Sequence, residues 1–241
     1  MQRDQIYSSE CDLVEEFRFD HSVAKVFPDM IQRSVPGYGT VISLVAVVAD
    51  NYLQNGTRGY DLGASLGAST LAMAATAQQR GCRVVAVDNS TAMVERCREN
   101  LANAGRAAAV ELCCEDIRDT VVENASFVVM NFTLQFIPVA EREEVLTGIA
   151  RGMRHGGALM LSEKICFEDP QQQQRMEELH HSFKRANGYS DLEISQKRTA
   201  LEEVLITETL DQHVERLRRA GFSTVEVLFQ ALNFVSILAV R

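Results

Sequence analysis

The sequence lacks an apolar segment long enough to cross a bilayer. Its best uninterrupted apolar run covers only residues 44–49, whereas a membrane-spanning helix needs about 20 apolar residues. The N-terminus, MQRDQIYSSECDLVEEF, is polar and acidic and has no apolar core of the kind found in secretory leaders. We therefore expect a cytoplasmic protein that does not contact membranes.

Patterns typical of disulfides and metal sites are also missing. The cysteines form no CxxC pair, and most lie in apolar stretches, where a free cysteine behaves as a small hydrophobic residue. The five histidines show no metal-site spacing, since the adjacent His180 and His181 would point to different sides of a helix. We predict no metal, and reduced, buried thiols at Cys11, Cys82, Cys97, Cys113, Cys114 and Cys166.

Basic charge is scarce. The formal net charge is -9 at pH 7, with 24 Lys and Arg against 33 Asp and Glu. Proteins bind the nucleic-acid backbone through clustered Lys and Arg, which release counterions from the phosphates. The charge therefore argues against tight direct binding of nucleic acid, and small molecules or proteins are the expected ligands.

No composition change marks a domain boundary. The chain has no repeat, no low-complexity tract and no linker rich in Pro, Gly or Ser, and its four prolines are scattered. A chain of this length can bury most of its surface as one domain. We predict a single domain over residues 1–241 with a helical cap at 1–54, in which 23–53 forms two helices broken at 34–39.

Short apolar runs alternate with amphipathic segments from Arg58 onward, which indicates strand–helix–strand units around a parallel sheet. The clearest helix has Ser90 as its N-cap and places Met93, Cys97 and Leu101 on one apolar face. The five expected strands cover residues 58–61, 83–88, 109–114, 126–131 and 158–163.

The last two β-rich runs, 224–232 and 234–240, are separated only by Asn233. So short a connection suits an antiparallel hairpin and cannot make a parallel crossover. A mostly parallel seven-stranded sheet ending in an antiparallel hairpin is typical of the Rossmann-like α/β fold of class I methyltransferases, which we predict. Residues 165–209 are polar and too long for a simple connection, so we expect a helical insertion after the fifth strand.

A glycine-rich turn carries the main functional signal. In GYDLGASLG, residues 59–67, glycines let the backbone turn tightly between a strand and a helix and approach a ligand closely. Asp88 ends the next strand, near the spacing at which an acid accepts ribose hydroxyls. Asp116 and Ile117 follow the third strand, within reach of an adenine. Each acid alone is more often a solvated loop residue, but their order predicts an adenosyl site, and no triphosphate motif is present.

The fourth strand ends in Met130-Asn131-Phe132-Thr133. Many amino-methyltransferases acting on DNA or on protein glutamine have Asn-Pro-Pro and an aromatic residue here, and this chain lacks the prolines. Such substrates are therefore disfavoured, and Asn131 is expected near the sulfonium end of the cofactor. The carboxylate cluster of metal-assisted catechol transfer is also missing.

Seven strings spread between residues 26 and 198 resemble the carboxy-S-adenosyl-L-methionine synthases, a family with the class I methyltransferase fold. The first and last strings lie outside the generic cofactor motifs and are the most specific. One departure is Ala64, where the family more often has Cys; a backbone contact there would survive. The strings are VFPDMIQRSVPGY (26–38), YDLGAS (60–65), DNS (88–90), EDIRD (115–119), NASFVVMNFTLQF (124–136), LSEK (161–164) and FKRANGYSDLEISQKR (183–198).

The resemblance implies an enzyme that converts S-adenosylmethionine and prephenate into carboxy-S-adenosylmethionine and phenylpyruvate. A separate carboxymethyltransferase would then use the product to modify the wobble uridine of certain tRNAs. Such a reaction needs positioning and a cation but no side-chain nucleophile, and the sequence shows no Ser/His/Asp or Cys/His arrangement.

The resemblance also implies the site residues. The adenosyl and amino-acid parts of the ligand would be bound by Tyr38, Gly63, Ala64, Ser65, Asp88, Asn89, Asp116, Ile117 and Asn131. Arg198 would hold the added carboxylate, as arginine suits a bidentate contact better than lysine does. We interpret Lys184 and Lys197 as part of a solvated helix face, and we expect the insertion to wrap a second subunit of a homodimer.

Two other functions stay open. One is an ordinary S-adenosylmethionine-dependent methyltransferase acting on a small molecule or tRNA. The other is a protein that binds S-adenosylmethionine without catalysis and works through a partner.

Overall fold

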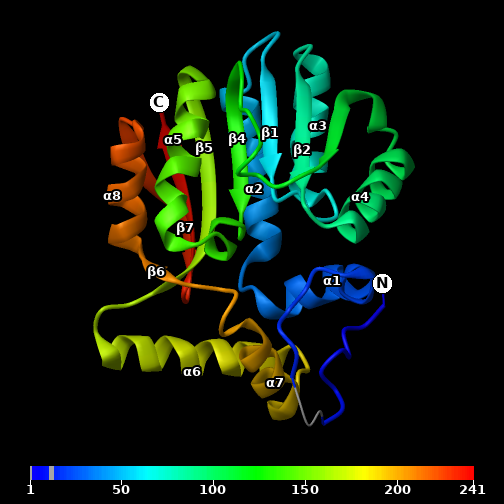
Figure 1. Ribbon diagram of the computed structural model, residues 1–241, viewed down its shortest axis with the longest axis vertical. Coiled ribbons are helices and arrows are strands. Elements are labelled where there is room, and N and C mark those ends of the chain that lie inside the picture. The colour runs from blue at the N-terminus through cyan, green and yellow to red at the C-terminus, as the bar shows by residue number, and fades with distance from the viewer. Residues whose placement is uncertain (1, 11–13) are drawn as a thin grey trace.

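The computed structural model describes residues 2–10 and 14–241 and has an α/β architecture (Figure 1). Seven strands form a sheet in the order β3-β2-β1-β4-β5-β8-β7, and the short β6 pairs with β5 off this path. The pairings along β3-β2-β1-β4-β5 are parallel, and β8 runs antiparallel to both β5 and β7. The strands are β1 (Arg58–Leu62), β2 (Arg83–Asp88), β3 (Val110–Cys114), β4 (Ala125–Asn131), β5 (Met153–Cys166), β6 (Glu208–Thr209), β7 (Thr224–Ala231) and β8 (Phe234–Val240).

This order confirms the predicted Rossmann-like sheet and its C-terminal hairpin. β5 is longer than expected at both ends, because its N-terminal part pairs with β4 and its C-terminal part with β6. The helices are α1 (His21–Ser34), α2 (Tyr38–Tyr52), α3 (Ala68–Gln79), α4 (Thr91–Asn103), α5 (Arg142–Gly152), α6 (Pro170–Ala186), α7 (Asp191–Leu201) and α8 (Leu210–Ala220).

The central strands are buried on both faces, which explains their continuous apolar runs. In β4, Phe127 and Val129 pack on the face covered by α2 and α3. The alternate residues, Val128 and Met130, pack on the opposite face, where α5 and α8 contribute Leu146 and Leu217 among others. Side chains of one strand therefore serve two apolar cores.

The two helices of residues 1–54 lie in different places. α2 packs against α3 and the sheet, because Val41, Val45, Val48 and Ala49 form an apolar stripe at helical spacing. α1 instead lies across the end of the sheet at which the parallel strands point, beside α6 and α7 (Figure 1). Of these two helices, α1 thus covers the strand ends and α2 does not.

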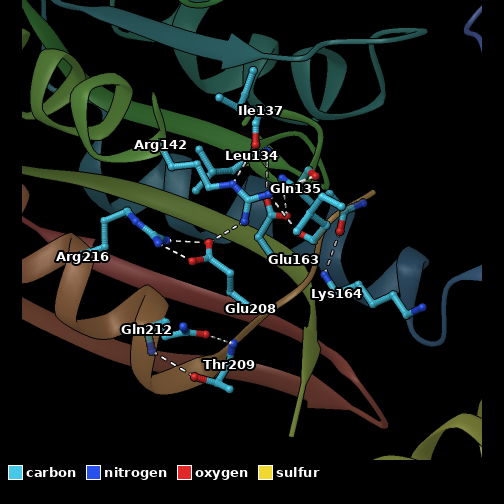
Figure 2. Close-up of polar contacts among 11 residues, drawn as sticks. Leu134, Gln135, Ile137, Arg142, Glu163, Lys164, Glu208, Thr209, Gln212 and Arg216 are labelled. Carbon is cyan, nitrogen blue, oxygen red and sulfur yellow. Dashed lines mark hydrogen bonds and ion pairs between the residues drawn. The ribbon is translucent and has the colours of Figure 1, made fainter. Parts of the chain in front are cut away.

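Helices α6 and α7 form the centre of the predicted insertion. Asp169 caps α6 by accepting hydrogen bonds from the Gln171 and Gln172 amides, and Ser190 forms a capping box with Glu193 at the start of α7. After α7 the chain returns through β6. Glu208 in β6 pairs there with the buried Arg142 and Arg216 (Figure 2).

The prediction of buried thiols is only partly correct. Cys82 and Cys97 are buried, whereas Cys114 is exposed and Cys113 and Cys166 are half-buried. Cys113 and Cys114 lie in β3, which is an edge strand of the sheet and is therefore covered less completely. Cys11 lies outside the described residues.

In the described parts of the chain no single helix is long and apolar enough to cross a membrane. α1 and α2 reach that length and composition only together, and they are bent by 97° at the break between them.

Candidate functional site

A cavity of about 700 Å³ opens at the carboxyl ends of the parallel strands, beneath α1. Nine of the ten predicted site residues line it, namely Tyr38, Gly63, Ala64, Ser65, Asp88, Asn89, Asp116, Ile117 and Asn131. Arg198 is the exception. It is exposed on α7 and does not line the cavity.

The glycine-rich turn between β1 and α3 packs directly against the segment that follows β4. Gly63 has a φ of +85°, and a Cβ atom on it would collide with the Thr133 side chain. Gly67 also has a positive φ and is the N-cap of α3, and Ser65 has a φ of 49°. The turn is therefore closely packed, and only glycine fits at position 63.

Asp88 at the end of β2 is held by two backbone amides. The Ser65 amide donates to Oδ2 at 2.8 Å, and the Ser90 amide donates to Oδ1 at 2.9 Å. Burial raises the pKa of Asp88, while these two hydrogen bonds oppose the rise. Each carboxylate oxygen keeps a free lone pair, so both can accept from the hydroxyls of a ribose.

Asp116 is paired with a residue that sequence reasoning missed. Arg118 donates to both carboxylate oxygens, at 3.0 Å from Nε and 2.8 Å from the terminal nitrogen, and these hydrogen bonds lower the pKa of Asp116. Arg118 also lines the cavity and pairs with Glu141. It lay only two positions beyond Asp116, in the EDIRD string that the family shares.

Asn131 has an unused acceptor. Its Nδ2 donates to Ser69 Oγ at 3.0 Å, whereas its buried Oδ1 has no hydrogen-bond partner among the described residues. A buried acceptor without a donor is costly. A ligand ammonium would satisfy it, and the amino-acid part of S-adenosylmethionine carries one. The residues present at this end therefore fit an adenosyl amino acid.

Glu163 holds the loop that follows β4 and lines the cavity. Its two oxygens accept hydrogen bonds from the backbone amides of Leu134 and Gln135, each at 3.0 Å (Figure 2). Burial raises the pKa of Glu163 to about 8, although the nearby Arg142 opposes this. Gln135 in turn accepts from the Lys164 amide at 3.0 Å. These contacts fix the loop after β4. The sequence contains a signal for this role, since Glu163 is an acidic residue within an otherwise apolar strand.

Aromatic rings form much of the wall. Phe19 makes edge contacts with Phe27 and Phe136, at centroid distances of 6.1 and 5.4 Å. Phe132 contacts the rings of Tyr38 and Phe234. Burial raises the pKa of Tyr38 to about 12, so its hydroxyl is neutral at pH 7.

The part of the cavity wall formed by β5, α6 and α7 is basic. We call this part the basic end; it consists of Lys164, His180, Lys184 and Lys197. The interpretation of Lys184 and Lys197 as solvated is wrong. Lys197 is only 6% exposed, and Lys184 is half-buried and lines the cavity. The reason is that α6 packs against α1 and α7, so that the inner faces of these helices close the cavity.

A metal centre finds no support in the part of the chain that the structure describes. No group of three or more His, Cys, Asp or Glu side chains there could hold a metal ion.

Comparisons with known proteins agree with this geometry. A family model described as a methyltransferase domain matches residues 60–157. The chain is 56% identical over 239 residues to the carboxy-S-adenosyl-L-methionine synthase of Geobacter metallireducens, covering 99% of this chain and 98% of that protein. The protein of the same name from Actinobacillus pleuropneumoniae is 48% identical, with both chains covered completely.

Solved structures show the same fold at low sequence identity. Human N-acetylserotonin methyltransferase in complex with SAM aligns with a TM-score of 0.61 at 13% identity, over 92% of this chain and 55% of that one. An O-methyltransferase family protein from Burkholderia thailandensis aligns with a TM-score of 0.63 at 14% identity, over 91% and 58%.

Proposed function

The chain belongs to the family of the carboxy-S-adenosyl-L-methionine synthases, and we propose that it converts S-adenosylmethionine and prephenate into carboxy-S-adenosylmethionine and phenylpyruvate. One observation carries the proposal: a single cavity combines the expected adenosyl site at β1, β2 and β4 with the basic end at β5, α6 and α7. A methyl donor alone explains the first part. The basic end calls for a second, anionic substrate.

The proposed reaction begins when prephenate aromatises to phenylpyruvate and releases carbon dioxide and hydroxide. Hydroxide removes a proton from the sulfonium methyl group and becomes water. The resulting ylide carbon attacks carbon dioxide and forms the new carbon–carbon bond. The protein would contribute confinement and orientation, since carbon dioxide and the ylide must meet before either escapes or is protonated.

Arg198 is proposed as the residue that binds the new carboxylate. In the single chain it lies on the exposed side of α7. Its charge still lowers the pKa of Lys164 and Lys184, so Arg198 lies near the cavity of its own chain. We propose in addition a homodimer in which the insertion of one subunit wraps the other. A guanidinium near the sulfonium opposes binding of S-adenosylmethionine, so a cation there is useful only when a carboxylate forms.

The proposed product would serve a separate carboxymethyltransferase that modifies the wobble uridine of tRNA in the cytoplasm. The present chain would not bind the tRNA itself. Its net charge of -9 supports this division of labour.

Mass spectrometry tests the proposed function directly. Purified protein is incubated with S-adenosylmethionine, with and without prephenate, and the nucleoside and keto-acid products are identified. We expect a nucleoside heavier than S-adenosylmethionine by one carbon dioxide, together with an equal amount of phenylpyruvate, only when prephenate is present. Release of S-adenosylhomocysteine with a methylated acceptor would favour the methyltransferase alternative. Binding without any turnover would favour the non-catalytic one.

A further inference from the structure

Lysine is rare in this chain, and most of the lysines line the cavity. It contains four lysines, Lys25, Lys164, Lys184 and Lys197, and three of them line the cavity. Lys25 is exposed on α1. In a protein with a net charge of -9, this local excess of positive charge is unusual and requires an explanation.

Lys197 has partners within the protein. Its Nζ donates to Ser34 Oγ at 3.1 Å, lies 3.9 Å from Asp4 Oδ2 and stands 5.5 Å from the centre of the Tyr189 ring. These contacts join α7 to α1 and to the N-terminal segment. Lys197 is therefore satisfied structurally and need not bind a ligand.

Lys164 and Lys184 differ from Lys197. Among residues 2–10 and 14–241, neither ammonium group makes a hydrogen bond or lies within 4.0 Å of a carboxylate. Figure 2 shows the Lys164 side chain extending away from the polar network around Glu163, with no contact drawn to its ammonium. Both residues line the cavity, one from β5 and the other from α6.

The surroundings disfavour their charge. Burial and the positive charges of Lys197, Lys164 and Arg198 lower the pKa of Lys184 to about 7. Burial and Arg198 also lower the pKa of Lys164, which only Glu177 and Cys166 oppose. His180 offers no counter-charge, because burial keeps its ring neutral; its Nε2 donates to the Ser34 carbonyl oxygen at 2.8 Å. An anion entering this space would relieve the repulsion and pair with both lysines.

Aromatic side chains lie beside the two lysines, because Phe234 in β8 pairs with Lys164 in β5, and His180 precedes Lys184 by one turn of α6. Phe234 contacts the His180 ring at a centroid distance of 5.0 Å and the Phe132 ring at 6.0 Å, and all three residues line the cavity. The basic end therefore offers paired cations beside a surface that can pack a six-membered carbon ring. Prephenate has this combination, with one carboxylate on a cyclohexadiene ring and a second on its pyruvyl side chain.

The position of the lysines separates them from the ribose and adenine end of the adenosyl site. Asp88 ends β2 and Asp116 follows β3, whereas Lys164 lies in β5, next to β4 and its terminal Asn131 at the amino-acid end of that site. Resting on the function proposed above, we infer that Lys164 and Lys184 bind a carboxylate of the second, anionic substrate. The adenosyl ligand occupies the other end.

Single and double Lys→Gln variants test this inference, with Lys25→Gln as the matched control. Binding is measured by calorimetry, first with S-adenosylhomocysteine and then with prephenate added to the protein saturated with S-adenosylhomocysteine, which prevents turnover. We expect Lys164→Gln and Lys184→Gln each to weaken prephenate binding about tenfold or more, the scale of a lost charge-assisted contact. The affinity for S-adenosylhomocysteine should stay within about twofold and also reports that the variants are folded.

Three results would overturn the inference. Unchanged prephenate affinity in the double variant would show that the lysines do not contact this substrate. An equal loss for both ligands would assign them to the carboxylate of the adenosyl ligand. A loss of the same size in Lys25→Gln would indicate a nonspecific charge effect.

Failure of the proposed function can be recognised separately. If wild-type protein makes no carboxylated product and does not bind prephenate, malonate is titrated instead as a dicarboxylate with no part in the reaction. Malonate binding that disappears in the double variant but persists in Lys25→Gln would support an anion site at Lys164 and Lys184. Absence of malonate binding to the wild type would reject it.

Discussion

The backbone amide of Ser65 donates a hydrogen bond of 2.8 Å to the Asp88 carboxylate and so joins the glycine-rich turn to the end of β2. Ser65 has a positive φ of 49°, which a residue other than glycine adopts only where its surroundings hold it. Asp88 therefore has two roles: it orders the turn and presents its remaining lone pairs to the cavity.

Replacement of Asp88 by alanine should largely abolish binding of S-adenosylmethionine. The substitution leaves ribose hydroxyls and the Ser65 amide without an acceptor, at a cost of roughly 1 to 3 kcal/mol or more. Calorimetric titration measures the affinity, with the exposed Asp50→Ala as control. Unchanged affinity in Asp88→Ala would show that the ribose lies elsewhere.

The ion pairs around Glu208 should stabilise the fold. Glu208 accepts from the completely buried Arg142 and, at 2.8 Å, from Arg216 (Figure 2). Glu208→Ala removes the ion-pair partner of two buried guanidinium groups, so the free energy of unfolding should fall by about 3 to 5 kcal/mol. Urea denaturation measures it. Glu143→Ala, which removes an exposed pair with Arg219, should cost no more than about 1 kcal/mol.

Acid should weaken the same contacts. Burial alone would raise the pKa of Glu208, but hydrogen bonds and charges from Arg216 and Arg142 outweigh it and hold the pKa below its usual 4.5. A carboxyl whose pKa is lower in the folded state stabilises the protein above its unfolded pKa and loses this effect as pH falls. The difference in unfolding free energy between wild type and Glu208→Gln should therefore shrink below about pH 4.5.

That the residues expected to bind the adenosyl ligand line one cavity could be predicted, because their determinants are local. Gly63, Asp88 and Asn131 each lie at the end of a parallel strand, and strand ends of one sheet meet at one edge whatever the helices do. Alternation of short apolar runs was sufficient to find those strands. The residue order then placed the side chains together.

The basic end could not be predicted in this way. The basic residues of α6 and α7 are visible in the sequence, but helical spacing does not reveal which side of a helix is covered. That depends on the packing of α6 against α1 and on the contact of Lys197 with Asp4, nearly two hundred residues away. Lys184 and Lys197 were therefore assigned to solvent, although they line the cavity.

The protein alone should not bind tRNA tightly. With a net charge of -9 it repels phosphate at long range, and its cavity lysines are too enclosed to follow a nucleic-acid backbone. Filter binding at physiological salt should give only weak retention of unmodified tRNA. Tight, salt-sensitive binding would instead support the tRNA methyltransferase alternative.

Arg198→Ala should separate the two adenosyl ligands. We expect the affinity for S-adenosylmethionine to be unchanged or slightly higher, because a cation near the sulfonium has been removed. The affinity for carboxy-S-adenosylmethionine should fall by about 1.5 to 3 kcal/mol, the scale of a charge-assisted hydrogen bond. Calorimetry with both ligands measures this, and the exposed Arg218→Ala is the control. Equal losses for both ligands would assign Arg198 to structure or to the shared amino-acid part.

Prephenate binding should take up protons at alkaline pH. Lys184, with a pKa of about 7, is mostly neutral at pH 8 before the anion enters, and a bound carboxylate raises its pKa and restores the ammonium. Lys197 keeps its contacts with Ser34 and Asp4, so the uptake is assigned to Lys184. His180 does not contribute, since burial lowers its pKa to about 3.

Calorimetry at pH 8 in two buffers of different ionisation enthalpy measures this uptake. We expect about one proton per prephenate bound to wild-type protein saturated with S-adenosylhomocysteine, and less than about half of that in Lys184→Gln. The affinity of the wild type should decline as pH rises above 7, because a growing fraction of Lys184 must be protonated before it can pair. Lys25→Gln should retain the full uptake. Equal uptake in Lys184→Gln and the wild type would show that this lysine does not change its protonation when the anion binds.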